Sequence, residues 1–267
     1  MERELVHLSV ERIYGDWGIE REAAEALIDS APAPRTPEML YDIAGQLGLG
    51  PGSRVLDAGC RDARHAAPLA ERFQCDVIAL DITRFGLEVA RHRLGSRLPL
   101  LQASIEAIPL RDAAVGFIWC TDVLTLVPDL ARALVECARV IRPGAPMLVY
   151  QSFATPLLAD FEAEEMYARD AIPAANMDAG RFERTAGAAG FRIEWKDELH
   201  GEWRETGELV ERTSLALVRL SRMRRDRERI ERALGAEMYA HLLSGYQWGV
   251  YQMLGKLAPT IYVLRRA

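Results

Sequence analysis

Short apolar segments alternate with amphipathic segments between residues 38 and 151, and this alternation constrains the fold more than any other feature of the sequence. Continuous apolar character is typical of strands that are buried on both faces of a sheet. The expected strands cover residues 54–58, 76–80, 98–102, 114–121 and 146–151. The expected helices cover residues 38–47, 64–73, 86–94 and 130–141. This order predicts an α/β fold, in which a doubly wound parallel sheet carries helices on both faces.

The pattern changes after residue 151. Residues 156–190 are predicted to be helical, residues 190–200 resemble a strand, and residues 204–255 form a long helical block before a last apolar strand at 260–264. Because a strand returns after this block, we interpret the block as an insertion within the sheet topology. The expected organisation is an N-terminal helical cap (1–40), a cofactor-binding core (41–151) and a part that completes the sheet and carries a helical lid (152–267, with the lid at about 204–255).

Composition narrows the class of protein. The net charge of −6 argues against nucleic acid as a partner, and the arginines of residues 219–232 alternate with acids as on a solvated helix. The four cysteines lie far apart and share no metal-ligand spacing, so we expect reduced, buried thiols and no metal. No apolar run reaches the length of a membrane span, and the first residues lack the apolar core of a signal peptide. We therefore expect a cytoplasmic protein that does not bind membranes.

The segment Ser53-Arg-Val-Leu-Asp-Ala-Gly-Cys-Arg-Asp-Ala-Arg-His65 is a predicted strand, a glycine turn and the start of a helix. The N-terminus of a helix offers free N–H groups and the positive end of a dipole, which suits a nucleotide-like ligand. Asp57 ends this strand, and Asp81 ends the next one 24 residues later. The Asp81 carboxylate is suited to accept hydrogen bonds from two ribose hydroxyls, although a solvated loop acid or a helix cap is the alternative interpretation.

Five motifs occur in order: Val55-Leu-Asp-Ala-Gly-Cys60, Leu80-Asp81, the segment 104–112, the segment 117–124 and Ala138-Arg-Val-Ile-Arg-Pro-Gly144. Together they resemble the class I S-adenosylmethionine-dependent methyltransferases over residues 40–151. The resemblance implies a Rossmann-like, seven-stranded sheet whose last strand is antiparallel, and residues 260–264 fit that strand.

The resemblance also implies roles for individual residues toward S-adenosylmethionine. Asp57 would orient the loop and the methionine amino group, and Asp81 would bind the ribose. The other expected contacts are the backbone of Gly59 and Cys60, Ile82 on the adenine, Ser104 and the Ile105 N–H near the adenine ring, and the Cys120 carbonyl toward the methionine moiety.

Two positions depart from the family pattern, because Arg61 and Ala63 stand where the family usually has glycine. Arg61 either obstructs the close approach of backbone and cofactor or binds the cofactor carboxylate with its guanidinium. The resemblance therefore leaves two functions open at this position, which are catalysis and cofactor binding without methyl transfer.

Aromatic residues outside the core are candidates for a substrate pocket. Tyr246, Trp248 and Tyr251 lie close together in the helical block, and Tyr14 and Trp17 lie near the N-terminus beside two glycines. One interpretation is an apolar wall of a pocket, with a mobile lid at the N-terminus, and the other is core packing.

His200 and Asp122 are the candidates for a general base, since each is predicted at the end of a strand. Methyl transfer from a sulfonium depends mainly on alignment and desolvation, so the reaction has no absolute need for a base.

The sequence thus predicts methyl transfer from S-adenosylmethionine to a small, partly apolar molecule, such as a secondary metabolite, enclosed by helical lids. The alternatives are a non-catalytic S-adenosylmethionine-binding protein and a protein of the same fold that catalyses another reaction, such as cyclisation. A homodimer is one expected state of assembly.

Overall fold

The computed structural model describes residues 24–25, 27–28, 35–95, 97–199 and 214–267. The chain divides into two compact units, Met1–Pro34 and Arg35–Ala267. The four described residues of the first unit are helical. The second unit contains the sheet and all of the features discussed below.

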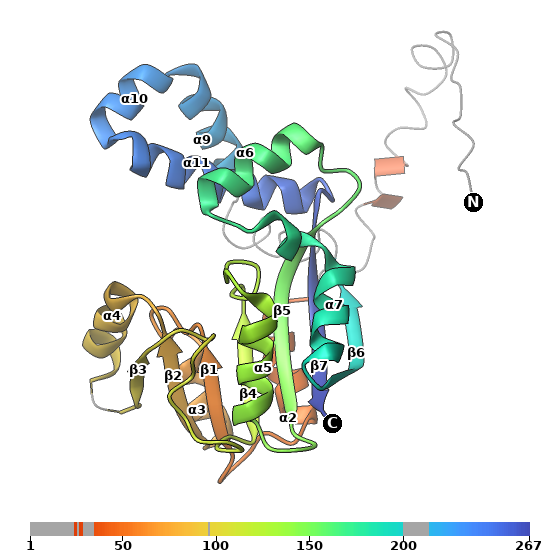
Figure 1. The fold of residues 1–267 in the computed structure, drawn as a ribbon. Helices are drawn as coiled ribbons and strands as arrows, with labels where there is room; N and C mark the ends of the chain where they lie inside the picture. The colour runs from red at the N-terminus through yellow and green to blue at the C-terminus, as the bar shows by residue number, and fades with distance from the viewer. Residues whose placement is uncertain (1–23, 26, 29–34, 96, 200–213) are drawn as a thin grey trace. The chain divides into compact units, whose positions relative to one another are not determined.

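The second unit is built on one seven-stranded sheet with the strand order β3-β2-β1-β4-β5-β7-β6 (Figure 1). Strands β1 to β5 are parallel to one another, whereas β7 is antiparallel to both β5 and β6. The strands are β1 (Arg54–Ala58), β2 (Asp76–Asp81), β3 (Leu100–Gln102), β4 (Phe117–Thr121), β5 (Pro146–Ala154), β6 (Phe191–Glu198) and β7 (Leu257–Arg266). The predicted Rossmann-like α/β fold with an antiparallel last strand is confirmed.

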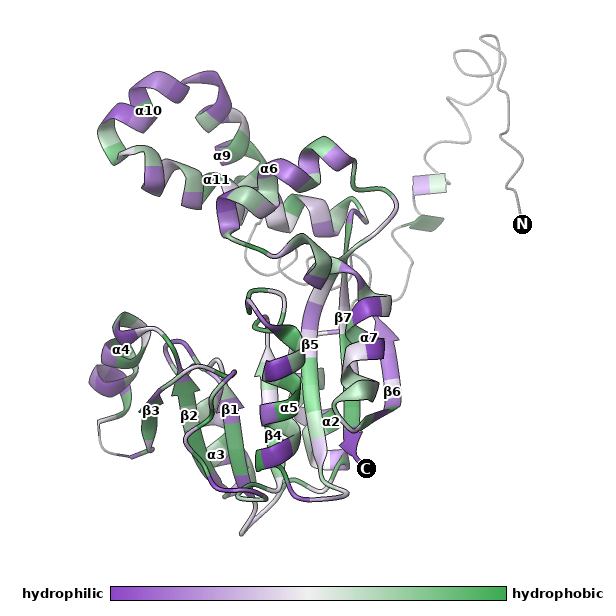
Figure 2. Ribbon diagram, viewed as in Figure 1, coloured by the Kyte–Doolittle hydropathy of each residue, from purple (hydrophilic) through white to green (hydrophobic). Residues whose placement is uncertain are grey.

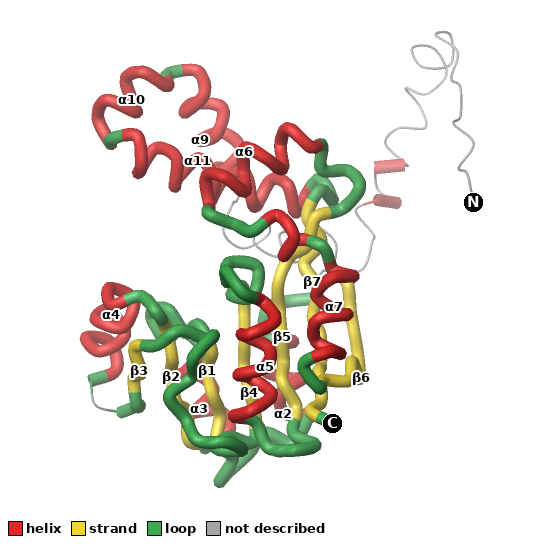
Figure 3. Tube along the Cα trace, viewed as in Figure 1, coloured by secondary structure: helices red, strands yellow, loops and turns green. Residues whose placement is uncertain are grey.

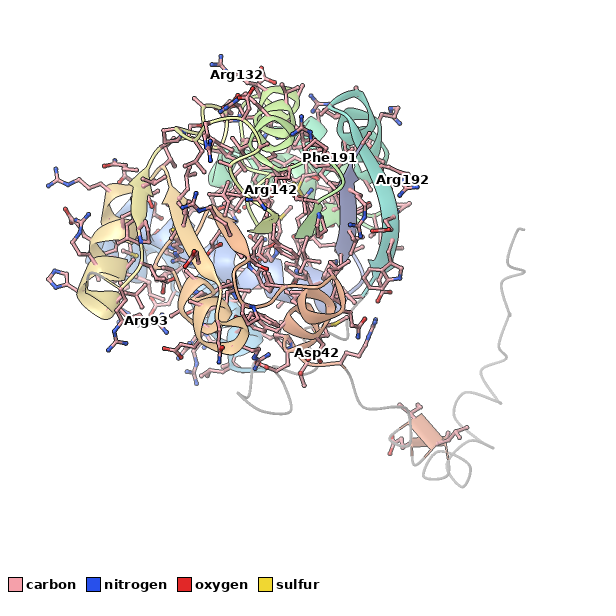
Figure 4. The ribbon with its side chains drawn as sticks, turned by 90° about the horizontal axis from the view of Figure 1, so that it is seen from below. Asp42, Arg93, Arg132, Arg142, Phe191 and Arg192 are labelled. Carbon is pink, nitrogen blue, oxygen red and sulfur yellow. The ribbon has the colours of Figure 1, made fainter. Side chains whose placement is uncertain are left out.

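Helices cover both faces of the sheet. One face packs against α2 (Met39–Gln46), α3 (Ala66–Phe73) and α4 (Arg84–Leu94), and the other packs against α5 (Leu130–Val140) and α7 (Ala179–Ala188). Figure 4 shows the two layers from below, with Asp42 of α2 and Arg132 of α5 on opposite sides of the strands. The central strands are strongly apolar and lie between these layers (Figure 2), which is the distribution expected for a parallel sheet buried on both faces.

A helical cap follows the carboxyl end of β5, and Figure 3 shows it beyond that edge of the sheet. Its parts are α6 (Asp160–Asp170), the short 3₁₀ helix η2 (Ala174–Met177), α9 (Ser214–Arg225), α10 (Arg227–Leu234) and α11 (Ala236–Met253). The last three lie between β6 and β7, where an insertion was predicted. Apolar side chains of α6, η2 and α11 pack against Leu257 of β7, and a second apolar cluster joins α9, α10 and α11.

Several elements differ in length from the prediction. Strand β5 continues to Ala154, three residues beyond the expected end, because its pairing with β7 extends from Pro146↔Arg265 to Ala154↔Leu257. Helix α3 begins at Ala66, two residues after the predicted start, and the turn before it contains the left-handed residues Arg61 and Ala63.

The four cysteines are buried and carry free thiols. Within the described ranges, no helix has the length and apolar character needed to cross a membrane.

Candidate functional site

The turn between β1 and α3 brings three strand ends together. Gly59 has a φ of 81°, and its N–H donates a hydrogen bond to the Leu80 carbonyl at 2.8 Å. A Cβ atom at Gly59 would lie 2.2 Å from Cγ2 of Val123, which follows β4. Only glycine fits here, because the position requires both a left-handed backbone and the absence of a side chain. The carboxyl ends of β1, β2 and β4 are thereby packed into one site.

Arg61 and Ala63 keep the backbone conformation of glycine, with φ values of 50° and 54°. The Arg61 N–H donates to Asp81 Oδ2 at 2.7 Å, and a Cβ atom at Gly86 of α4 would lie 2.9 Å from the Arg61 carbonyl oxygen. A left-handed backbone conformation at a residue other than glycine lowers the stability of the folded state by about 1 kcal/mol. The Arg61 side chain is exposed, whereas Ala63 is buried.

Asp81 ties the two loops of the site together. Its Oδ2 atom accepts from the Arg61 N–H, and its Oδ1 atom accepts from the N–H of Thr83 at 2.7 Å and from the Thr83 hydroxyl at 2.5 Å. The side chain is buried, which rules out the interpretation as a solvated loop acid. A carboxylate has about four acceptor positions, so Asp81 retains room for one further donor without rearrangement.

Asp57 is buried at 2% exposure, and its Oδ2 atom has no hydrogen-bond partner among the described residues. Burial raises the pKa of Asp57 to about 7, with further contributions from the negative charges of Asp81 and Asp62. A buried carboxylate oxygen without a partner fits a cationic hydrogen-bond donor, such as the amino group of an amino acid. The hydrogen-bond acceptors at this turn therefore fit the cofactor that the family resemblance implies.

Aromatic side chains pack beneath Asp57. Tyr41 of α2 stacks on Trp119 of β4 with ring centroids 5.1 Å apart, and its hydroxyl is 2.9 Å from Nδ1 of His65. Trp119 is fully buried and lies opposite Asp57 in the pairing of β1 with β4, and its Nε1 atom has no partner in the described part of the chain. Burial is the main cause that lowers the pKa of His65, which favours the neutral ring. This packing holds α2 and α3 against the sheet below the site.

The other predicted cofactor residues lie along the same edge of the sheet. Cys60 donates its N–H to the Leu80 carbonyl at 2.9 Å, and Ile82 follows β2 with its side chain exposed. Ser104 follows β3 and is paired with Glu106, and Ile105 is buried in the core. Cys120 lies within β4, fully buried, and burial raises the pKa of its thiol well above the usual range. The structure thus groups Asp57, Gly59, Cys60, Arg61 and Asp81 closely. Ile82, Ser104 and Ile105 follow the ends of β2 and β3, and Cys120 lies within β4.

The predicted substrate-pocket aromatics do not form one surface. Tyr246 packs with the cluster of α9, α10 and α11, whereas Trp248 and Tyr251 pack with α6 and β7. Tyr251 is itself buried, so its placement matches the alternative interpretation as core. Tyr14, Trp17 and the candidate base His200 lie outside the described residues.

The candidate base Asp122 directly follows β4. It is exposed, has a left-handed φ of 54°, and donates its N–H to the Tyr150 carbonyl at 2.8 Å. This backbone hydrogen bond places Asp122 at the carboxyl edge of the sheet beside β5.

Asn176 fixes the loop that follows Asp122, and the sequence analysis did not identify it. Its Nδ2 atom is 2.8 Å from the Val127 carbonyl oxygen and 3.4 Å from each of the Leu124 and Thr125 carbonyl oxygens. The Arg181 guanidinium donates to Asn176 Oδ1 at 3.0 Å, so the buried amide is fully engaged. Nothing in the local sequence signals the contacts with the carbonyl groups, because those partners are about 50 residues away.

Gln151 of β5 is a second buried polar residue that was not identified from the sequence. It is 1% exposed, and neither atom of its amide has a hydrogen-bond partner in the described part of the protein. The signal in the sequence was a polar amide inside an otherwise apolar strand. It immediately follows Tyr150, the last β5 residue that pairs with β4.

Apolar side chains surround the carboxyl edge of the sheet. They come from the segments after β2, β4 and β5, and all are at least half exposed: Ile82, Phe85, Leu126, Leu157 and Phe161. We call this set the apolar rim. Exposed apolar groups at a ligand-binding edge are typical of a site for a partly apolar ligand.

Comparison with known proteins finds a family model that matches the residues of this site. Residues 56–149 match the model of a methyltransferase domain. Over 105 residues the chain is 40% identical to malonyl-acyl carrier protein O-methyltransferase of Serratia marcescens, an alignment that covers 38% of this chain and 40% of the relative. The chain thus spans about two fifths of the length of two of the curated relatives that it matches.

Solved structures show the same fold over most of the chain. A sarcosine dimethylglycine methyltransferase from Galdieria sulphuraria superposes with a TM-score of 0.67 at 18% identity, covering 86% of this chain and 84% of that protein. The cyclase SpnF superposes with a TM-score of 0.64 at 15% identity, covering 98% and 97% of the two chains. At these identities the likeness establishes the fold alone.

Proposed function

Because residues 56–149 match the model of a methyltransferase domain, we propose that the chain is a class I S-adenosylmethionine-dependent methyltransferase that transfers the methyl group of S-adenosylmethionine to a small, partly apolar molecule. The observation that carries the proposal is the turn at Gly59, where the buried Asp57 Oδ2 atom, which has no partner among the described residues, lies at the same strand edge as Asp81. The matched domain covers this turn and the ends of β2 and β4.

Asp57, Gly59 and Asp81 would hold the cofactor, which supplies a methyl group activated by a positively charged sulfur. The Asp57 carboxylate would accept from the ammonium group, and the positive charge would favour the ionised form of a carboxyl whose pKa is otherwise raised to about 7. The free acceptor position of Asp81 would receive a ribose hydroxyl, and the exposed Ile82 would contact the adenine. Ser104, Ile105, Cys60 and Cys120 are the further candidates for contacts with the cofactor.

The acceptor would bind against the apolar rim, beneath the helical cap acting as a lid. This assignment is supported by the exposed Leu126 and Leu157, which would lose contact with water when an apolar molecule binds. Asp122 is the described candidate for a general base, and His200 is the other candidate. Removal of water by a lid would favour displacement at the methyl carbon even without a base.

Calorimetric titration with S-adenosylhomocysteine tests the cofactor assignment, and the absence of binding would refute the proposed function. Incubation with S-adenosylmethionine carrying a labelled methyl group then tests transfer. Sarcosine and a malonyl thioester are the first acceptors to examine, because the names of similar proteins include them. In Asp122→Asn, a slower transfer with unchanged affinity for S-adenosylhomocysteine would identify Asp122 as the base.

A second candidate function is a reaction other than methyl transfer, such as cyclisation, or cofactor binding alone. Arg61 and Ala63 support this candidate, because they replace the glycines of the family pattern. The fold is compatible with it, since SpnF is a cyclase of similar structure. Analysis of the products distinguishes the candidates, because only methyl transfer moves the label from the cofactor to the acceptor.

A further inference from the structure

We propose that the guanidinium group of Arg61 binds the carboxylate at the amino-acid end of the cofactor, and that Arg61 thereby contributes a contact that the glycine of the family pattern cannot make. This inference rests on the proposed function. It assigns a recognition role to the residue that departs most from the family pattern.

The Arg61 backbone is fixed on both sides. Its N–H is bonded to Asp81 Oδ2 at 2.7 Å, and its carbonyl oxygen lies so close to Gly86 that a Cβ atom there would be only 2.9 Å away. Because both peptide groups are held, the exposed side chain leaves the backbone from a defined point beside the glycine turn. The left-handed backbone allows the loop to keep the conformation of a glycine loop while it carries an arginine.

With respect to the described residues, Arg61 is the arginine of this loop that remains unpaired. Arg64 pairs with Asp62 at 3.0 Å, and Arg93 of α4 approaches the other oxygen of Asp62 at 3.9 Å. Within the described residues, the Arg61 side chain forms no hydrogen bond or ion pair, and it is attracted to Asp62 only over a longer range. A guanidinium without a close acidic partner is suited to bind a carboxylate from a ligand with two parallel hydrogen bonds.

The turn therefore offers two complementary charges to an amino acid. Asp57 is buried, and its Oδ2 atom has no partner among the described residues, which suits an ammonium group. Arg61, four residues later in the same turn, adds an exposed positive charge for the carboxylate. A free α-amino acid carries both groups on one carbon atom, so a single ligand end satisfies both residues.

Calorimetric titration with two ligands tests this assignment. The ligands are S-adenosylhomocysteine and its decarboxylated form, which lacks only the carboxylate. We expect Arg61→Ala to weaken the binding of S-adenosylhomocysteine about 10-fold, which is the amount of one charge-assisted contact at an exposed site. The affinity of Arg61→Ala for the decarboxylated ligand should stay within about 2-fold of the wild-type affinity. Arg61→Lys retains the charge without the paired donors, so it should lose only part of the affinity.

Two further variants control for the fold. Arg64→Ala removes a neighbouring arginine that is already paired, and it should leave the preference between the two ligands unchanged. Arg61→Gly restores the residue best suited to a positive φ, so it should raise the melting temperature by about 2–4 °C. Like Arg61→Ala, it should lose the preference for S-adenosylhomocysteine over the decarboxylated ligand.

Three results would overturn the inference. Arg61→Ala could weaken the binding of both ligands equally, which would indicate a structural role, or it could change the binding of neither ligand. Arg61→Gly could bind S-adenosylhomocysteine more tightly than the wild type, which would show that Arg61 obstructs the site. A wild-type protein that binds neither ligand would instead refute the proposed function and this inference together.

Discussion

Replacement of Gln151 by leucine should stabilise the protein, because it removes a buried polar amide from a central strand and puts an apolar side chain of similar size in its place. Gln151 is 1% exposed, and both atoms of its amide lack partners among the described residues. Each buried polar group that makes no hydrogen bond costs about 1–3 kcal/mol relative to water. Leucine needs no such partner and fills a comparable volume.

Gln252 provides a matched control, because it is equally buried and its amide is bonded. Its Nε2 atom donates to the Ser152 hydroxyl at 2.7 Å. Gln252→Leu would remove this bond and leave the Ser152 oxygen without that donor. We expect Gln151→Leu to raise the free energy of unfolding by about 1–3 kcal/mol and Gln252→Leu to lower it by a similar amount.

Urea unfolding, monitored by circular dichroism, measures both changes in the free energy of unfolding. Each change appears as a shift of the transition midpoint, while the dependence of the free energy on urea concentration stays constant. Opposite signs for the two variants support the reasoning. If Gln151→Leu lost as much stability as Gln252→Leu, the Gln151 amide would have partners in the folded protein, such as a buried water, and the argument from its unpartnered atoms would be refuted.

The remaining predictions concern the site and its loops. Gly59→Ala should abolish S-adenosylhomocysteine binding in calorimetry and lower the melting temperature, because the new Cβ would lie 2.2 Å from Val123; unchanged binding would contradict the close packing of this turn. The pKa of Asp57 is raised to about 7 from 3.8, so the folded protein holds this proton more tightly than the unfolded chain, and its contribution to stability should fall as pH rises from about 4 to about 7. Asp57→Asn should remove up to about 4 kcal/mol of this pH dependence in urea titrations across that range, whereas an unaltered slope would show that Asp57 titrates normally. Asn176→Ala should lower the free energy of unfolding by about 1–3 kcal/mol in the same assay, since the Val127 carbonyl and its neighbours lose a buried donor; a neutral effect would indicate that the loop is held by other contacts.

The sequence predicted the layered α/β fold because the signal is local. Each strand of the core is a short apolar run, and each helix shows an amphipathic period, so neither requires knowledge of its partners. The strand that ends at Asp57, the glycine after it and the acid at Asp81 also lie in short segments, and the chain order of the five motifs indicated that these segments meet at one edge of the sheet. Element ends were less accurate: β5 runs to Ala154 because β7, more than 100 residues later, continues to pair with it.

The sequence alone therefore determined the fold class, the strand that returns at the end of the chain and the location of the candidate cofactor turn. Only the tertiary structure decided how individual side chains are used. It showed that Arg61 adopts the backbone conformation of glycine and that Tyr246 and Tyr251 belong to different clusters. It also showed that the Gln151 amide is buried and has no partner in the part of the chain that the structure describes. The physical reason is that burial and hydrogen bonding depend on groups brought together from distant parts of the chain, whereas strand and helix patterns depend on near neighbours.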